Sequence, residues 1–170
     1  MLSKQIYADA PAYCHSFFDL VQESDLLTAL QSNKEQTIAL LNAVPTNKEN
    51  FAYADGKWTT KEVFRHIIDC ERIYAYRAFR FSRFDATELA SFDVSSYITN
   101  THNLTIPLSM VLTEFVNLRN STINLFETMT DEMLDFKGIA NKVSFTPRGL
   151  GFMVVGHAMH HCNVVRERYL

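Results

Sequence analysis

The stretch TTKEVFRHIIDCERIYAYRAFRF, residues 59–81, decides the fold class of this chain. It opens with a capping box, in which Thr59 caps the first turn and the Glu62 side chain reaches back to the capping residue. Apolar residues then recur at i, i+3, i+4 and i+7, which predicts a helix with one long buried face. His66 and Arg77 lie on that face among the apolar side chains. A histidine there is either hydrogen-bonded within the core or a ligand to a metal.

Three further segments show the same helical periodicity. They cover residues 24–44, 107–133 and 146–168. Ser24 and Thr146 are good helix caps, whereas Pro107 and Pro147 suit the first turn of a helix. Glycine and proline are few and fall mostly between the periodic segments, and no strand pattern is visible. Four long amphipathic segments therefore predict an all-α four-helix bundle.

The connections and the amino-terminal residues complete this predicted architecture. The segment 85–105 is polar but contains Phe92 and Tyr97, so we expect an ordered crossover loop that packs on the bundle. Connections of this length allow crossovers, so simple up-down-up-down order is not required. Residues 1–22 carry aromatic side chains and are expected to form an arm on the bundle, which occupies residues 23–170 of a single domain.

Composition narrows the functional class. A net charge of −3 in 170 residues gives no electrostatic reason to expect nucleic-acid binding, which usually needs a basic face. No apolar run approaches the ~20 residues that span a membrane, and residues 1–10 lack the apolar core of a secretory signal, so we expect a cytoplasmic protein. The cysteines Cys14, Cys70 and Cys162 are widely spaced and form no Cys-x-x-Cys motif, which fits a reducing compartment.

Histidines on the predicted helices suggest a metal site. His157 and His161 are four residues apart, so on a helix they lie on one face, about 6 Å apart. Both belong to the apolar stripe of the last helix, as His66 does on the second. Three imidazoles that converge inside a bundle could hold a metal with at least one open position, which is typical of catalytic zinc. Hydrogen-bonded core histidines are the alternative interpretation, and His160 could replace His161 as a ligand.

Neighbours of these histidines leave several interpretations open. Cys70 shares the face of His66, so it either closes the site as Cys-His₃ or is a buried packing thiol. Asp69 could be a fourth ligand, an acceptor for an imidazole N–H, or a surface acid. Gly156 indicates close approach of another backbone, room for a ligand, or a packing notch between helices. Arg77 could bind a carboxylate or form an internal salt bridge.

Other metal classes fit the sequence less well. Di-iron bundles need paired Glu-x-x-His motifs, and none occurs in this chain. The His-Glu-x-x-His motif of zinc proteases is also absent, because Ala158 stands where its glutamate would be. The most obvious general base beside a metal is therefore missing.

Three motifs of this chain resemble those of the DinB-like (DinB/YfiT) family of damage-inducible four-helix-bundle proteins. They are Gly56–His66 (GKWTTKEVFRH), Glu71–Arg77 (ERIYAYR) and Gly156–His161 (GHAMHH). The resemblance covers about residues 20–170, and the order and spacing of the motifs make it fairly specific. It implies a metal site formed by one histidine of the second helix and a His-x₃-His of the last, which carries over onto His66, His157 and His161.

The same resemblance carries implications for function. Such proteins have crossed connections, bind a divalent metal such as zinc or nickel, and frequently dimerise, so a homodimer is implied here. Characterised relatives include S-transferases that use low-molecular-weight thiols such as bacillithiol, and a mycothiol-dependent isomerase. Relatives often carry glutamate at the position of Ala158, so its absence weakens a hydrolase role for this chain.

The expected function is a metal-dependent transfer of a thiol to a small electrophile. A metal held by three neutral imidazoles would bind and deprotonate the thiol at neutral pH. The segment 85–105 and the helix ends would form the access route, beside which Trp58, Tyr97 or Arg77 would lie. Metal-assisted hydrolysis is one alternative. A non-catalytic, stress-response metal-binding bundle with a closed coordination sphere is the other.

Overall fold

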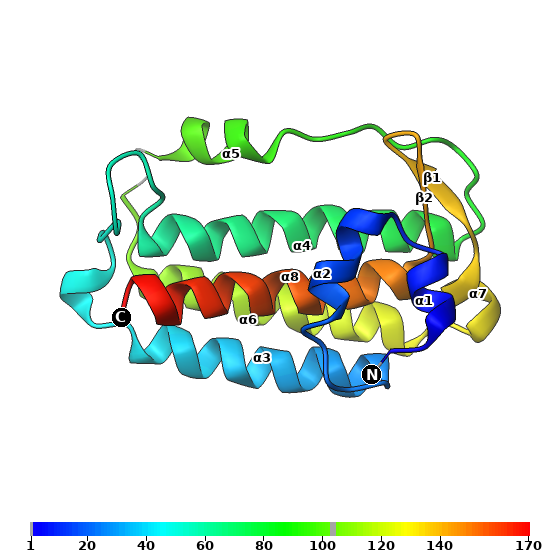
Figure 1. Cartoon of the computed structure of the whole chain (residues 1–170), viewed down its shortest axis with the longest axis horizontal. Helices are drawn as coiled ribbons and strands as arrows, with labels where there is room; N and C mark the ends of the chain where they lie inside the picture. Colours follow the sequence, from blue (N-terminus) through cyan, green and yellow to red (C-terminus); the bar gives the residue numbers. More distant parts are fainter. Residues whose placement is uncertain (1, 103–104) are drawn as a thin grey trace.

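The computed structural model describes residues 2–102 and 105–170. Four long helices lie side by side along the molecule (Figure 1): α3 (Leu26–Ala43), α4 (Thr60–Ser82), α6 (Leu108–Glu127) and α8 (Pro147–Arg168). Helix α3 packs against α6 and α8, and α4 packs against the same two helices, so α3 and α4 occupy opposite corners. The predicted all-α four-helix bundle is confirmed.

Local capping chemistry fixes where these helices begin. The Asp25 side chain accepts a hydrogen bond from the Thr28 amide at 2.8 Å, so α3 is capped one residue later than the predicted Ser24. Both halves of the predicted capping box are present at the start of α4. At α8, the Thr146 hydroxyl accepts from the Gly149 amide at 3.0 Å, which satisfies one of the unpaired amides of the first turn.

The long connection between α4 and α6 follows from their direction. Both helices run the same way along the bundle, so the chain must return over its full length before α6 can start (Figure 1). The crossover predicted for residues 85–105 is therefore confirmed for residues 85–102 and 105, whereas residues 103–104 lie outside the described part of the chain. It contains a helix where the sequence predicted a loop. This helix, α5 (Val94–Thr101), is capped by the Asp93 carboxylate and buries Ile98.

The third predicted segment is divided. Helix α6 ends at Glu127, and a separate short helix, α7 (Asp131–Asp135), starts after the Thr130 cap. A two-stranded antiparallel hairpin then leads to α8, with strands β1 (Gly138–Ala140) and β2 (Val143–Phe145). The expectation of a chain without strands was wrong at this point.

The residues of the hairpin turn explain why the sequence did not predict these strands. Asn141 and Lys142 form the turn, and both have positive φ angles, 51° and 63°, as in a type I′ turn. The usual signal for such a turn is a glycine at its second position, which this chain lacks. The glycine that is required lies in β1, where a Cβ on Gly138 would stand 2.1 Å from the Phe81 ring.

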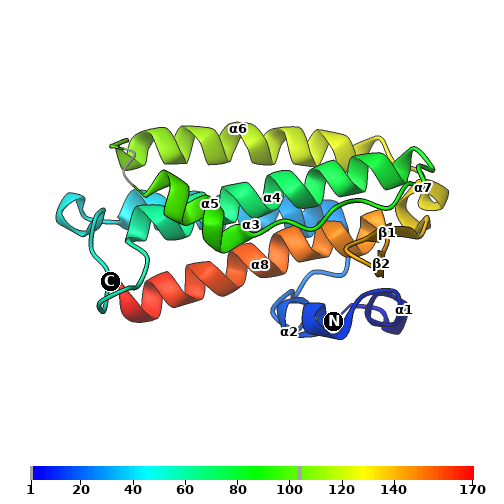
Figure 2. The ribbon, with the colours of Figure 1, turned by 90° about the horizontal axis from the view of Figure 1, so that it is seen from above.

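The amino-terminal arm packs on α8, on the side away from α6 (Figure 2). It consists of α1 (Lys4–Ala8), a 3-10 turn (Ala12–Cys14) and α2 (His15–Phe18). Phe18 and Cys14 are completely buried against the bundle. Gly156 lies under the arm, where an added Cβ would stand 2.3 Å from the Phe17 carbonyl oxygen. Of the interpretations offered for this glycine, close approach of another backbone is confirmed.

The substitution Gly156→Ala tests this contact. Within a helix, replacing glycine by alanine normally stabilises by about 1 kcal/mol. Here the added methyl group would overlap the Phe17 backbone, so we expect a loss of about 1–3 kcal/mol in urea unfolding. The exposed change Arg166→Ala on the same helix should alter stability by less than about 0.5 kcal/mol. A stabilised Gly156→Ala protein would show that the arm does not rest on α8 in this way.

A buried ion pair crosses the bundle between α4 and α6. The Arg119 guanidinium is fully buried and donates two hydrogen bonds to the Glu71 carboxylate, at 2.9 and 2.8 Å. Its remaining Nη1 group donates to the Asn33 side-chain oxygen at 2.7 Å and to the Leu30 carbonyl at 3.3 Å. This group links α3, α4 and α6.

None of the helices in residues 2–102 and 105–170 combines the length and the apolar character that a membrane-spanning helix needs.

Candidate metal centre

Three histidines converge between α4 and α8. The Nε2 atom of His66 lies 3.0 Å from Nε2 of His161 and 3.0 Å from Nε2 of His157. All three ligand nitrogens lie within 4.8 Å of one another. The structure therefore brings together the three side chains that the sequence analysis singled out, from positions about 90 residues apart in the chain.

Helix geometry produces this convergence. His157 and His161 are separated by one helical turn of α8, so both rings point to the side of α8 that packs on α4. His66 points back from α4 between them. His66 and His157 are only 5% and 6% exposed, whereas His161 is half-buried. The centre is therefore closed on the bundle side and accessible past His161.

Burial keeps these imidazoles neutral. Burial first, and the neighbouring histidines second, lower the pKa of His66 to about 4 and that of His161 to about 3. The pKa of His157 lies well below its ordinary value for the same reasons, burial first. Neutral imidazoles keep a nitrogen lone pair, which is what a metal ligand requires.

The lowered pKa values predict a stability loss in mild acid for the metal-free protein. In the unfolded chain these histidines take up protons below about pH 6.5, whereas the folded state resists protonation until about pH 4. The free energy of unfolding therefore has its full value above about pH 6.5, and it falls as the pH drops toward 4. Urea unfolding of chelator-treated protein at neutral pH and about pH 5 measures the loss.

A matched pair of variants assigns this loss to the centre. His161→Gln should reduce the pH dependence, because it removes one of the buried groups. Arg166→Ala should leave it unchanged, because that side chain is exposed and does not titrate in this pH range. Equal stability of the unmodified protein at both pH values would contradict the burial of neutral imidazoles.

The donor set fits a divalent metal. A nitrogen ligand lies about 2.0–2.1 Å from zinc, so two ligands of one ion are at most about 4.2 Å apart; the two 3.0 Å separations lie inside this limit. Hydrogen bonding alone explains the arrangement poorly. The Nε2 atom of His66 carries one proton or one lone pair, so it makes one well-directed hydrogen bond, yet it faces two other Nε2 atoms.

Neither of the considered fourth ligands belongs to the cluster. Among the described residues, the donors that lie within 4.8 Å of one another are the three histidines, without Asp69 or Cys70. The Cys70 sulfur lies 3.8 Å from Nδ1 and 3.9 Å from Nε2 of His66, and burial raises the pKa of its thiol to about 12. Asp69 lies 3.7 Å from Arg72 on the flank of α4. The cluster of converging donors among the described residues is therefore a face of three nitrogens.

His160 stands beside the centre without joining it. Its ring lies 4.9 Å from that of His161 and edge-on to Phe17 at 5.5 Å, and the side chain is exposed. It is not among the three histidines whose ligand nitrogens converge. Of the two alternatives left open by the sequence, the geometry favours His161.

Aromatic rings surround the three imidazoles. The Trp58 ring lies 4.7 Å from that of His66, while Phe17 and Tyr74 lie 5.7 and 5.9 Å from that of His157. Only Trp58 was among the residues considered for the access route. Phe17 comes from the arm, which carries no pattern that relates it to the centre. Tyr74 lies two turns beyond His66 on the same stripe, and that spacing could have indicated it.

Two other residues considered for the access route have different surroundings. Arg77 is buried and donates to the Ala90 carbonyl at 2.9 Å, with its guanidinium 5.2 Å from the Phe92 ring. It thus holds the crossover segment against α4, and among the described residues no carboxylate forms an internal salt bridge with it. Tyr97 packs beside Phe92 at 6.2 Å.

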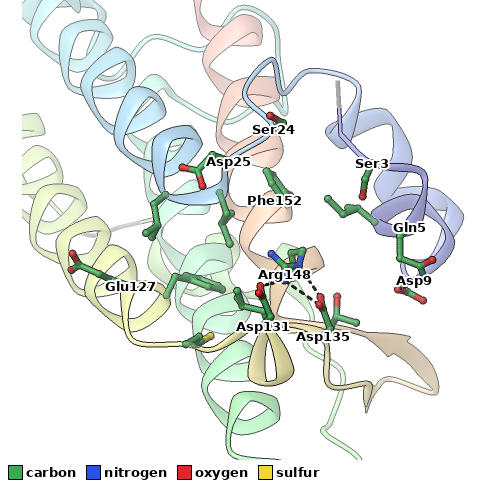
Figure 3. A pocket seen from close by; sticks show the side chains of 17 residues that line it. Ser3, Gln5, Asp9, Ser24, Asp25, Glu127, Asp131, Asp135, Arg148 and Phe152 are labelled. Atoms are coloured by element: carbon green, nitrogen blue, oxygen red, sulfur yellow. Dashed lines mark hydrogen bonds and ion pairs between the residues drawn. The ribbon is translucent and has the colours of Figure 1, made fainter.

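A cavity of about 350 Å³ opens beside the centre. Its walls include His161, Trp58 and Tyr169. A larger cavity of about 590 Å³ lies between the arm and the amino-terminal ends of α3 and α8 (Figure 3). In that cavity Arg148 pairs with Asp131 and Asp135. None of the three converging histidines lines the larger cavity, whereas His161 lines the smaller one, so of the two only the smaller cavity adjoins the centre.

Solved structures with the same fold support this architecture. The chain is similar to YfiT from Bacillus subtilis, described as a probable metal-dependent hydrolase with an unusual four-helix bundle topology. The two share 20% identity, with a TM-score of 0.73 over 84% of this chain and 82% of YfiT. A DinB-like protein of the same organism, YjoA, is 15% identical, with a TM-score of 0.61 over 85% of this chain and 89% of its own.

Sequence comparison identifies the family. No curated protein matches this chain. A family model for the DinB superfamily matches residues 29–165, which include α4, most of α8 and all three converging histidines. Because this match spans most of the chain, the protein belongs to the DinB superfamily.

Proposed function

We propose that this protein is a metal-dependent transferase that joins a low-molecular-weight thiol to a small electrophile. His66, His157 and His161 would hold one divalent cation, with zinc and nickel both suited to imidazole ligands. The observation that carries the proposal is the convergence of three buried Nε2 atoms on one point. Their neutral state at pH 7 supports it, because protonated imidazoles could not bind a cation.

The residues around the centre define its chemistry. A divalent cation bound there supplies a Lewis acid that makes a thiol or a water acidic enough to react near neutral pH. Three neutral ligands leave the cation's charge uncompensated. The rings of Trp58, Phe17 and Tyr74 exclude bulk water from the imidazoles. The half-buried His161 leaves the approach to the centre open on one side.

The choice of a thiol over water rests on the missing base. Ala158 is completely buried next to His157, and no carboxylate belongs to the cluster of donors among the described residues. Water has a pKa of about 15.7 and benefits most from a base, whereas a thiol has a pKa of about 8.5. In the transfer, the sulfur bonds to the electrophilic carbon, that carbon loses its leaving group, and the thiol proton goes to solvent.

Hydrolysis is the second candidate, because YfiT, which shares the fold, is described as a probable metal-dependent hydrolase. A direct comparison of the two reactions separates the candidates. Zinc-loaded or nickel-loaded protein is assayed with bacillithiol and 1-chloro-2,4-dinitrobenzene, and in parallel with 4-nitrophenyl acetate. We expect metal-dependent thiol conjugation and no ester hydrolysis above the rate with metal-free protein.

Matched variants make the comparison decisive. His66→Ala should lower conjugation by more than about 100-fold, whereas His102→Ala, a change at an exposed histidine outside the centre, should leave it unaltered. Metal-dependent ester hydrolysis without conjugation would favour the second candidate and overturn the first. A bound metal with neither reaction would favour a non-catalytic metal-binding bundle.

A further inference from the structure

We propose that the 350 Å³ cavity beside His161 binds the electrophile, and that it selects a flat aromatic molecule that carries an anionic group. This inference rests on the proposed function, because it names the substrate class of the same centre. It is carried by the position of the cavity, by the rings that line it and by the charge of its rim.

Position connects this cavity with the centre. His161 is both a wall of the cavity and one of the three converging donors. The Trp58 ring, another wall, lies 4.7 Å from the ring of His66 and 6.5 Å from that of His161. A molecule in the cavity therefore contacts the half-buried edge of the centre, while His157 stays buried behind it.

The lining suits a flat apolar group. Three aromatic side chains, Trp58, Tyr53 and Tyr169, and two valines, Val63 and Val164, form most of its walls. The Tyr169 hydroxyl donates to the Trp58 carbonyl at 2.8 Å, and the Tyr53 ring packs edge-on against Tyr169 at 5.2 Å. These contacts fix the segment before α4 to the end of α8, so the aromatic walls are held in place. The volume is at the small end of ligand cavities.

The rim of the cavity carries one positive charge. Lys57 lines it, and no acidic side chain does so among the described residues. The larger cavity has the opposite character: five carboxylates line it, and its single arginine is already paired with two of them (Figure 3). In a chain with a net charge of −3, the cavity beside the centre is thus the one of the two that attracts an anion.

Trp58 makes this inference directly testable, because it is the single tryptophan of the chain. The probe is 4-toluenesulfonate, and its neutral counterpart is methyl 4-tolyl sulfone. Both are titrated into zinc-loaded protein and into chelator-treated protein while Trp58 fluorescence is followed. We expect saturable binding of the sulfonate to both forms, about two- to fivefold tighter than that of the sulfone.

Three variants locate the binding. Lys57→Gln should weaken the sulfonate about two- to fivefold and leave the sulfone unchanged. Lys142→Gln, on the hairpin turn at the other end of the bundle, should affect neither. Val164→Phe, which fills the cavity, should weaken both probes.

Several results would overturn the inference. One is that the protein binds the sulfonate and the sulfone with equal affinity. Another is that Lys57→Gln leaves the affinity for the sulfonate unchanged. The third is that Trp58 fluorescence shows no saturable change. Failure of the proposed function would look different. In that case the sulfonate would still bind chelator-treated protein, while the protein would show no metal-dependent thiol conjugation.

Discussion

Replacing His157 with alanine is expected to abolish tight binding of one zinc ion per chain. His157 is one of the two almost fully buried donors of the cluster, and its removal leaves two imidazole nitrogens 3.0 Å apart. Changing only a hydrogen-bond partner of a metal ligand typically lowers affinity 10–100-fold, so loss of a ligand itself should exceed about 100-fold. Competition titration against a zinc chelator, with elemental analysis of the purified protein, measures the effect.

His160→Ala is the matched control for this experiment. His160 lies on the same helix and beside the same Phe17 ring, but outside the converging donors. Its variant should keep the zinc affinity of the unmodified protein. Circular dichroism and thermal unfolding of the metal-free variants confirm that both are folded. A His157→Ala protein with unaltered affinity would remove these histidines from any metal site.

Glu71→Ala is expected to destabilise the protein by about 3–5 kcal/mol, the largest stability effect that the structure predicts. The substitution leaves the fully buried Arg119 guanidinium without the carboxylate that accepts two of its hydrogen bonds. An uncompensated buried charge is far more costly than the pair that it replaces. Urea unfolding monitored by far-ultraviolet circular dichroism measures the change.

A surface ion pair supplies the control. Glu114 pairs with Arg72 at 2.7 Å, and both side chains are substantially exposed, so Glu114→Ala should change stability by about 0–1 kcal/mol. The double change Glu71→Leu and Arg119→Met should recover most of the loss, because an apolar pair can replace a buried ion pair. A loss below about 1 kcal/mol for Glu71→Ala would contradict the buried pairing.

Local sequence patterns were sufficient to predict the bundle. The capping box at Thr59 and Glu62 and the apolar periodicity of four segments depend on interactions within one helix, which a sequence displays directly. The long crossover was also predictable from its length. What the pattern could not supply was the eight-residue helix α5, whose serine and threonine residues resemble a loop, or the hairpin, whose turn has no glycine.

The candidate centre, too, was only partly predictable from the sequence. His157 and His161 share a face by spacing alone, and His66 lies on the apolar stripe of its own helix. The aromatic surroundings come from parts of the chain without periodicity. Tyr53 belongs to a polar linker, and Tyr169 follows the last helix, so only the packing of the linker on the end of α8 relates them to the centre.

The buried ion pair was not predicted for a related reason. Glu71 and Arg119 are charged residues in amphipathic helices, where a charge ordinarily marks the solvent face. Only the packing of α6 against α4 places them opposite each other and away from water. Their sequence positions carry no sign of this pairing.

X-ray absorption spectroscopy of the zinc-loaded protein tests the central claim most directly, because it identifies the ligand atoms. If His66, His157 and His161 hold the ion and one position stays open, the spectrum shows nitrogen ligands at about 2.0–2.1 Å and no sulfur until a thiol is added. A sulfur ligand at about 2.3 Å in the absence of added thiol would identify Cys70 as a ligand and contradict the open site. Zinc bound without histidine ligands would contradict the centre altogether.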